Sequence, residues 1–189
     1  AANIPHLLPW PQKVAWNGKK FQYRGTFVSL TENFCSIGME QPAGNKITGN
    51  PSSHPALSVK WVEDFPDIPL NRNEAYKLRV TSKGVEIEAI TETGVYRAIQ
   101  TLRQLTEKKG NGIAITGCEI TDWPAFRIRG FMQDVGRTYI STDELKREIA
   151  ILARYKINVF HWHLTENQAW RLQSKVFPML NDSVNTTRQ

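Results

Sequence analysis

Short segments of the first two thirds of the chain alternate hydrophobic and polar positions, a pattern typical of β-strands. Residues 21–30 (FQYRGTFVSL) and 76–90 (YKLRVTSKGVEIEAI) are rich in β-branched and aromatic side chains. In the second segment the alternation continues on both sides of SKG, which predicts a hairpin of two strands. Residues 112–126 (GIAITGCEITDWPAF) supply another strand, which breaks at Trp123–Pro124 because the residue before a proline is disfavoured in helices.

One segment of this part changes to the period of a helix. Its apolar positions recur three or four residues apart, at Val95, Ala98, Ile99, Leu102 and Leu105. Lys108 and Lys109 then suit the last turn of a helix, and Gly110 suits its end. We therefore expect an amphipathic helix that lies on the sheet and ends at Gly110.

After residue 124 the pattern becomes strand, helix and strand. Residues 127–136 and 157–164 predict the strands, and residues 141–156 predict the helix between them. Ser141 and Glu144 form a capping box at the helix start, and the inner helix face carries Leu145, Ile149 and Leu152. Such a short strand, helix and strand predict a βαβ unit with parallel strands. We place a domain boundary between residues 1–124 and 125–189.

Composition excludes several classes of protein. The chain has 189 residues, of which 40% are hydrophobic, enough for one domain or for a small domain and part of another. The net charge is +6, but the basic residues are scattered, so we expect no nucleic-acid partner. No apolar run is long enough to span a membrane, and the start AANIPHLLPWPQ fits a chain after removal of a signal peptide and an arbitrary starting point equally well. Cys35 and Cys118 lack metal-type spacing and predict two buried thiols.

Polar residues follow both strands of the predicted βαβ unit. Asp134 and Arg137 come at the end of the first strand, and Glu166 follows the second. Parallel strands lie about 4.8 Å apart and hold ligands beyond their carboxyl ends, so these residues should be neighbours. The forked donors of an arginine suit the adjacent hydroxyls of a sugar. An ion-pair cluster that only closes the sheet end fits the spacing equally well.

His161 and His163 lie two residues apart and therefore share one face of the second strand. Such a pair can chelate a metal, so a metal-dependent barrel hydrolase is one alternative. No further set of ligands follows these histidines, and we favour hydrogen-bonded packing within a sheet. We expect neither a metal nor another cofactor.

Two motifs in the second part resemble the family 20 glycoside hydrolases, the β-N-acetylhexosaminidases. Residues 129–137 (RGFMQDVGR) fit the family pattern R-G-x-M-x-D-x-x-R. Residues 158–171 (NVFHWHLTENQAWR) fit N-x-F-H-W-H-L-x-D-D-Q-x-W-R, and the upstream GVYRAIQTLRQL resembles the small domain of the family. The resemblance covers almost the whole chain. It implies an α+β N-terminal domain, a sheet with helices on one face, followed by an incomplete TIM-type (β/α)8 barrel.

The resemblance also implies a reaction, the exo-acting removal of terminal β-linked N-acetylglucosamine or N-acetylgalactosamine. The 2-acetamido group of the substrate attacks the anomeric carbon, so hydrolysis is substrate-assisted and retaining. Arg137 is implied to hold ring hydroxyls of the terminal sugar, and Glu166 to orient a histidine from a later strand. Asp134 and His163 are expected to support these two. Glu166 and Asn167 replace the usual Asp-Asp, which changes the geometry of this relay.

The catalytic Asp-Glu pair of the family lies on a strand beyond residue 189, so the isolated chain is expected to be inactive. Two strands cannot close a barrel of eight, so we expect a domain that is stable through residue 124 and is tethered to an incomplete barrel. The alternative is that residues 125–189 dock on the small domain or pair with another copy of the chain. The expected partner is a carbohydrate with a terminal N-acetylhexosamine, in a secreted, periplasmic or lysosomal-type compartment. A non-catalytic carbohydrate-binding module is the alternative.

Overall fold

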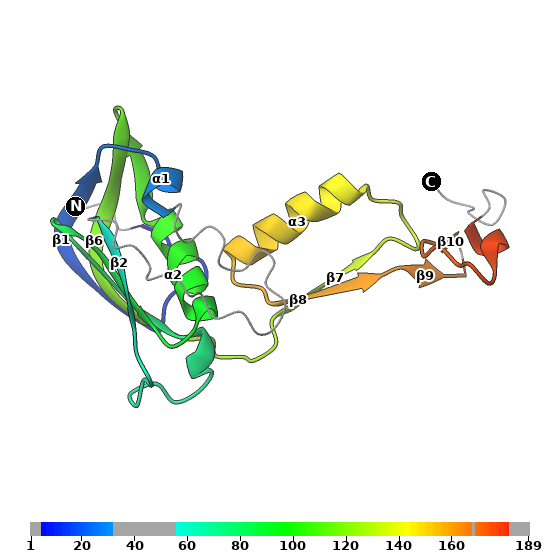
Figure 1. The fold of residues 1–189 in the computed structure, drawn as a ribbon, viewed down its shortest axis with the longest axis horizontal. Coiled ribbons are helices and arrows are strands. Elements are labelled where there is room, and N and C mark those ends of the chain that lie inside the picture. Colours follow the sequence, from blue (N-terminus) through cyan, green and yellow to red (C-terminus); the bar gives the residue numbers. More distant parts are fainter. Residues whose placement is uncertain (1–4, 32–55, 168, 182–189) are drawn as a thin grey trace. The chain divides into compact units, whose positions relative to one another are not determined.

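The computed structural model describes residues 5–31, 56–167 and 169–181. The chain forms two compact units, Ala1–Arg127 and Ile128–Gln189 (Figure 1). Cys35 lies outside the described residues, whereas Cys118 is buried as a free thiol. In the part of the chain that is described, no helix has both the length and the apolar character needed to cross a membrane.

A six-stranded mixed sheet forms the centre of the first unit. Its strands run in the order β1-β6-β3-β4-β2, with β5 also paired to β6. Only the pair of β2 and β4 is parallel, and the predicted hairpin of residues 76–90 is confirmed as β3 and β4. The bounds are β1 Lys13–Tyr23, β2 Leu57–Trp61, β3 Tyr76–Thr81, β4 Gly84–Ala89, β5 Thr106–Lys109 and β6 Gly112–Asp122.

Two helices, α1 (Phe27–Thr31) and α2 (Glu92–Gln104), lie on one face of this sheet (Figure 1). The hydroxyl of Thr91 caps α2 by accepting from the N–H of Gly94. A Cβ on Gly94 would lie 2.5 Å from the carbonyl oxygen of Ala75, so glycine allows the helix to approach the sheet closely. The core between helix and sheet contains Leu78, Val80, Ile87, Val95, Ala98, Leu102, Leu105, Ile115 and Ile120.

A buried polar network joins α2 to two strands of the sheet. The hydroxyl oxygen of Tyr76 lies 2.6 Å from Thr101 Oγ1 and donates to Asp122 Oδ2 at 3.0 Å. The other carboxylate oxygen of Asp122 accepts from the backbone N–H of Gln12 at 3.1 Å. Burial raises the pKa of the Tyr76 hydroxyl well above its usual value, so this hydroxyl keeps its proton and remains a donor.

Two expectations for the first unit were wrong. The predicted helix end at Gly110 is replaced by a hairpin, because residues 106–109 pair with β6 and Lys108 lies opposite Ile113. Gly110 has a φ of 57°, the left-handed conformation that this tight turn requires. The predicted strand at 21–30 ends early, since Thr26 and Ser29 exchange hydrogen bonds at the start of α1.

The second unit contains two parallel strands joined by a helix. They are β7 (Gly130–Asp134), α3 (Thr142–Arg154) and β8 (Val159–His163). The predicted capping box of Ser141 and Glu144 is confirmed. Leu145 is buried, whereas Ile149 is 45% exposed, so only part of the predicted inner helix face is covered in this unit. A short antiparallel pair follows, β9 (Thr165–Glu166) and β10 (Ala169–Trp170), and then a 3-10 turn at Pro178–Asn181.

Candidate functional site

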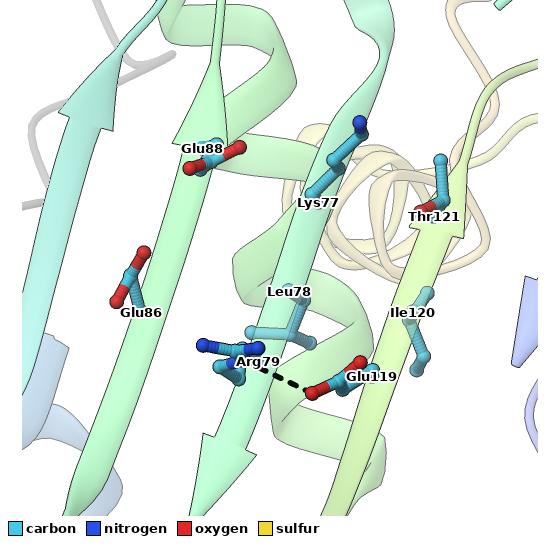
Figure 2. Close-up of a pocket in the computed structure, with 8 residues that line it drawn as sticks. All are labelled: Lys77, Leu78, Arg79, Glu86, Glu88, Glu119, Ile120 and Thr121. Carbon is cyan, nitrogen blue, oxygen red and sulfur yellow. Dashed lines mark hydrogen bonds and ion pairs between the residues drawn. The ribbon is translucent and has the colours of Figure 1, made fainter. Parts of the chain in front are cut away.

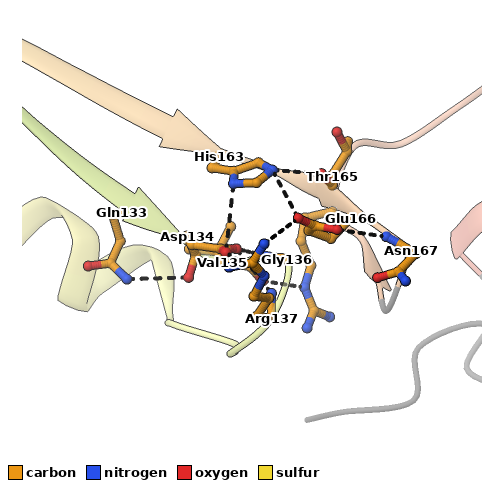
Figure 3. A network of polar contacts seen from close by, with 10 residues as sticks. Gln133, Asp134, Val135, Gly136, Arg137, His163, Thr165, Glu166 and Asn167 are labelled. Carbon is orange, nitrogen blue, oxygen red and sulfur yellow. Dashed lines mark hydrogen bonds and ion pairs between the residues drawn. The ribbon is translucent and has the colours of Figure 1, made fainter.

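The polar residues at the ends of β7 and β8 meet, as the parallel arrangement of the strands predicts (Figure 3). Arg137 Nη2 donates to Glu166 Oε1 at 2.7 Å, and Arg137 Nε lies 3.3 Å from Asp134 Oδ2. The guanidinium therefore lies between two carboxylates from different strand ends. The Arg137 side chain is 62% exposed, which leaves it accessible to a ligand.

Asp134 organises the turn that carries Arg137. Its Oδ1 accepts from the backbone N–H groups of Gly136 at 2.9 Å and Arg137 at 3.1 Å. The backbone N–H of Arg137 is the main cause that lowers the pKa of Asp134 from its usual value. The other oxygen, Oδ2, is buried and lacks a hydrogen-bond partner among the described residues, so its attraction to Arg137 Nε is Coulombic.

Glu166 closes the other side of this cluster. Its hydrogen bond with the Arg137 side chain is the main cause that lowers the pKa of Glu166. The second carboxylate oxygen accepts from the backbone N–H of Asn167 at 3.2 Å. Glu166 pairs with the buried Ala169 across β9 and β10. The short hairpin therefore fixes the position of the Glu166 backbone, from which the carboxylate extends. Both carboxylates are thus held in the charged form that Arg137 requires.

His163 lies beside the two carboxylates. Its Nε2 is 2.9 Å from the carbonyl oxygen of Thr165, and because a carbonyl can only accept, this nitrogen carries a proton. The other ring nitrogen, Nδ1, lies 3.7 Å from Asp134 Oδ2. His163 therefore bridges the end of β8 and the carboxylate at the end of β7. The four residues predicted for the site form one cluster.

The same cluster does not fit a metal centre. Asp134, His163 and Glu166 offer ligand atoms within 4.8 Å of one another. The guanidinium of Arg137, however, already contacts both carboxylates and supplies the positive charge. His161, the other member of the proposed metal pair, belongs to no group of three potential ligands in the described part of the chain. The alternative of a metal-dependent hydrolase has no support in this geometry.

A hollow lies on the sheet of the first unit (Figure 2). It is lined by Lys77, Leu78, Arg79, Glu86, Glu88, Glu119, Ile120 and Thr121. Arg79 Nε donates to Glu119 Oε1 at 3.0 Å, and both side chains are more than half exposed. Such exposed pairs contribute about 0–1 kcal/mol each. Glu88 is likewise paired, with Lys60 at 2.9 Å, so ion pairs between exposed side chains account for the charges that line this sheet face.

One residue of the site was not predicted from the sequence. Arg171 Nε donates to the carbonyl oxygen of Val135 at 2.9 Å, next to the turn that carries Arg137. The guanidinium carbon of Arg171 lies 5.6 Å from the ring centroid of Tyr139. Its place at the end of the second sequence motif was the only available signal.

Two family models match almost the whole chain. The model described as glycosyl hydrolase family 20, domain 2, matches residues 5–123. The model described as glycosyl hydrolase family 20, catalytic domain, matches residues 126–189. Both the sheet domain and the unit with the Arg137 cluster therefore match the same family.

Individual relatives agree with these models. A β-hexosaminidase of Porphyromonas gingivalis is 42% identical over 156 residues, which cover 79% of this chain and 18% of the relative. An inactive mutant of an exo-β-N-acetylglucosaminidase from Vibrio harveyi superimposes with a TM-score of 0.71 at 30% identity. This match covers 95% of the present chain and 29% of the Vibrio chain.

A mutant Streptomyces plicatus β-hexosaminidase in complex with its product GlcNAc has a TM-score of 0.69 at 26% identity. This match covers 96% of the present chain and 39% of the Streptomyces chain. The chain thus spans well under half the length of these three proteins. With family models matched across both units, the chain belongs to glycosyl hydrolase family 20.

Proposed function

We propose that this chain forms the sugar-holding part of the active site of an exo-acting β-N-acetylhexosaminidase. The enzyme would remove terminal β-linked N-acetylglucosamine or N-acetylgalactosamine. Membership of the family supports the reaction class. The assignment of the sugar-binding role to Arg137 rests on one observation. Its guanidinium is held between Asp134 and Glu166 at neighbouring strand ends.

Arg137 is the group that would contact the sugar. A guanidinium has five N–H donors, and the hydrogen bond to Glu166 uses one of them. Donors on the exposed part of this fork suit two adjacent ring hydroxyls, because the planar group can bind both at once. The two carboxylates restrict the rotation of the arginine, so less conformational entropy is lost when the sugar binds.

The hydrolytic step requires further groups. In the substrate-assisted reaction of this family, the acetamido carbonyl attacks the anomeric carbon while an acid protonates the leaving oxygen. An aspartate beside that acid orients the acetamido group. Glu166 would orient a histidine of the complete site, and His163 and Asp134 would support it. In this chain the longer glutamate side chain reaches Arg137 at 2.7 Å, so it also holds the sugar-binding residue.

We further infer that β7, α3 and β8 are the opening βαβ unit of a TIM-type (β/α)8 barrel, with the domain boundary at residue 124. Parallel strands joined by a helix are the repeating unit of that fold. The two strands leave large apolar side chains exposed to solvent: Phe131 is 38% exposed, Met132 53% and Trp162 46%. Further strands and helices of the barrel would cover these side chains. The alternative is that a second copy of the chain covers them. An exo-glycosidase of glycans suits a secreted, periplasmic or lysosomal-type compartment.

Two measurements on the 189-residue chain test this proposal. With an aryl β-N-acetylglucosaminide we expect no turnover, because Arg137 lowers the pKa of both carboxylates of the cluster, so neither holds a proton to give to the leaving oxygen. Turnover would contradict this division of roles. N-acetylglucosamine should nevertheless shift the NMR signal of the Arg137 side chain, and Arg137→Met should abolish binding. Binding without turnover by any longer form of the protein would support the carbohydrate-binding alternative instead.

A further inference from the structure

Arg171 connects the ends of both parallel strands in the second unit. Its backbone N–H donates to the carbonyl oxygen of Leu164, which directly follows β8, at 3.0 Å. Its side-chain Nε donates to the carbonyl oxygen of Val135, which directly follows β7, at 2.9 Å. The backbone of Arg171 is placed by β9 and β10, whose pairing turns the chain back toward these strand ends.

The carbonyl that accepts from Arg171 belongs to a peptide group that is held at both ends. Val135 C=O and Gly136 N–H lie in one plane, because the peptide bond has partial double-bond character. Arg171 Nε holds the oxygen at 2.9 Å, and Asp134 Oδ1 accepts from the N–H at 2.9 Å. Rotation of this plane would break one of the two hydrogen bonds. Arg137 follows directly, and its own backbone N–H donates to the same Asp134 oxygen at 3.1 Å, so the held peptide and this hydrogen bond together set the direction in which its side chain leaves the backbone.

The side chain of Arg171 is itself held in place. Its guanidinium lies over the ring of Tyr139, 5.6 Å from the centroid, which is within the range of a cation–π contact. An arginine can donate from Nε while its terminal nitrogens lie over a ring, whereas a lysine has a single ammonium group. The geometry therefore requires the arginine itself and not only its charge.

We propose that Arg171 is a positioning residue, which fixes the Val135–Gly136 peptide and thereby aims the Arg137 guanidinium at the sugar. The inference rests on the proposed function, because Arg137 is the residue that would contact the sugar. Arg171 acts through the turn at residues 134–137 and makes no contact with the sugar itself. Loss of its side chain should let Arg137 swing away from Glu166.

The experiment is an NMR pH titration of the Glu166 carboxyl in the 189-residue chain. Arg137 lowers the pKa of this carboxyl through a hydrogen bond, so the pKa reports where Arg137 points. We expect Arg171→Met to raise the pKa of Glu166 and to speed hydrogen exchange at the Gly136 amide. In an Arg137→Met background, Arg171→Met should raise the pKa no further, because the residue through which it acts is absent.

Two further variants complete the experiment. Arg154→Met removes an exposed arginine at the end of α3 and should leave the pKa of Glu166 unchanged. Arg171→Lys keeps the charge, so it remains informative if Arg171→Met does not fold, and it should also raise the pKa. An unchanged pKa in both Arg171 variants would overturn the inference. An equal rise with and without Arg137 would do so too, because it would reflect only the loss of a charge.

Sugar binding separates this inference from the proposed function. Arg171→Met should weaken N-acetylglucosamine binding by about tenfold or more, since loss of a hydrogen bond to a charged group costs about that much in affinity. If the unmodified chain binds no N-acetylglucosamine, the proposed function fails, while the titration still shows whether Arg171 positions Arg137.

Discussion

Gly136 offers a sharp test of how closely the two strand ends approach each other. A Cβ at this position would lie 3.0 Å from Glu166 Cβ and 3.3 Å from both Glu166 Cγ and Asp134 Oδ1. Carbon atoms pack best at about 3.5–4.0 Å, so Gly136→Ala must push Glu166 away by about half an ångström. The hydrogen bond of 2.7 Å between Arg137 and Glu166 would then lengthen to the limit of a good contact.

The expected loss of stability follows from these distances. Overpacking costs about 1–3 kcal/mol, and the exposed ion pair adds about 0–1 kcal/mol. We therefore expect Gly136→Ala to destabilise the second unit by about 1–4 kcal/mol and to raise the pKa of Glu166. Gly130→Ala is the matched control, because its Cβ would meet nothing closer than 3.9 Å. Alanine in place of a strand glycine should there gain up to about 1 kcal/mol.

Urea unfolding followed through NMR signals of α3 measures this difference in the second unit alone. Both substitutions remove a glycine from the unfolded chain, so that entropic effect cancels in the comparison. Equal stability of the Gly136→Ala and Gly130→Ala proteins, with the pKa of Glu166 unchanged, would show that the two strand ends do not approach as closely as described.

Two other predictions concern the buried Tyr76 network of the first unit and the Arg137 cluster of the second. Tyr76→Phe removes the donor to the buried carboxylate at the end of β6 and should destabilise the first unit by about 1.5–3 kcal/mol, measured by urea unfolding. Tyr96→Phe, in the same region, should cost less than about 0.5 kcal/mol; equal costs would contradict the network. In the second unit, the pKa values of Asp134 and Glu166 are lowered, so their contribution to stability is present above the usual carboxyl pKa of about 4 and is lost as the pH falls through the lowered values. Arg137→Met should reduce this acid-induced loss, and an identical pH profile for both proteins would refute that expectation.

The meeting of Arg137 and Glu166 was predictable because it depends on two regular features. Hydrophobic periods located the strands, and the short helical connection required them to be parallel, which brings their carboxyl ends together. The capping box of Ser141 and Glu144 was predictable for a similar reason, since both partners are three residues apart. Local spacing determines each of these contacts.

Other features depend on partners that the local sequence does not indicate. The segment ending in Lys108, Lys109 and Gly110 suits both a helix end and a hairpin turn, and pairing with β6 decides for the hairpin. Arg171 reaches Val135 only because two strands of two residues each reverse the chain. Strands that short have no periodic pattern, so the contact was not predictable from the sequence.

The most direct test of the account is a titration of the 189-residue chain with N-acetylglucosamine, followed through the NMR signal of Arg137 Nε–H. The account predicts a saturable shift of that signal, with a smaller shift at Gly136 and none in the first unit. No shift at Arg137 up to high sugar concentration, or a saturable response that survives in Arg137→Met, would contradict the role of this cluster in holding the sugar.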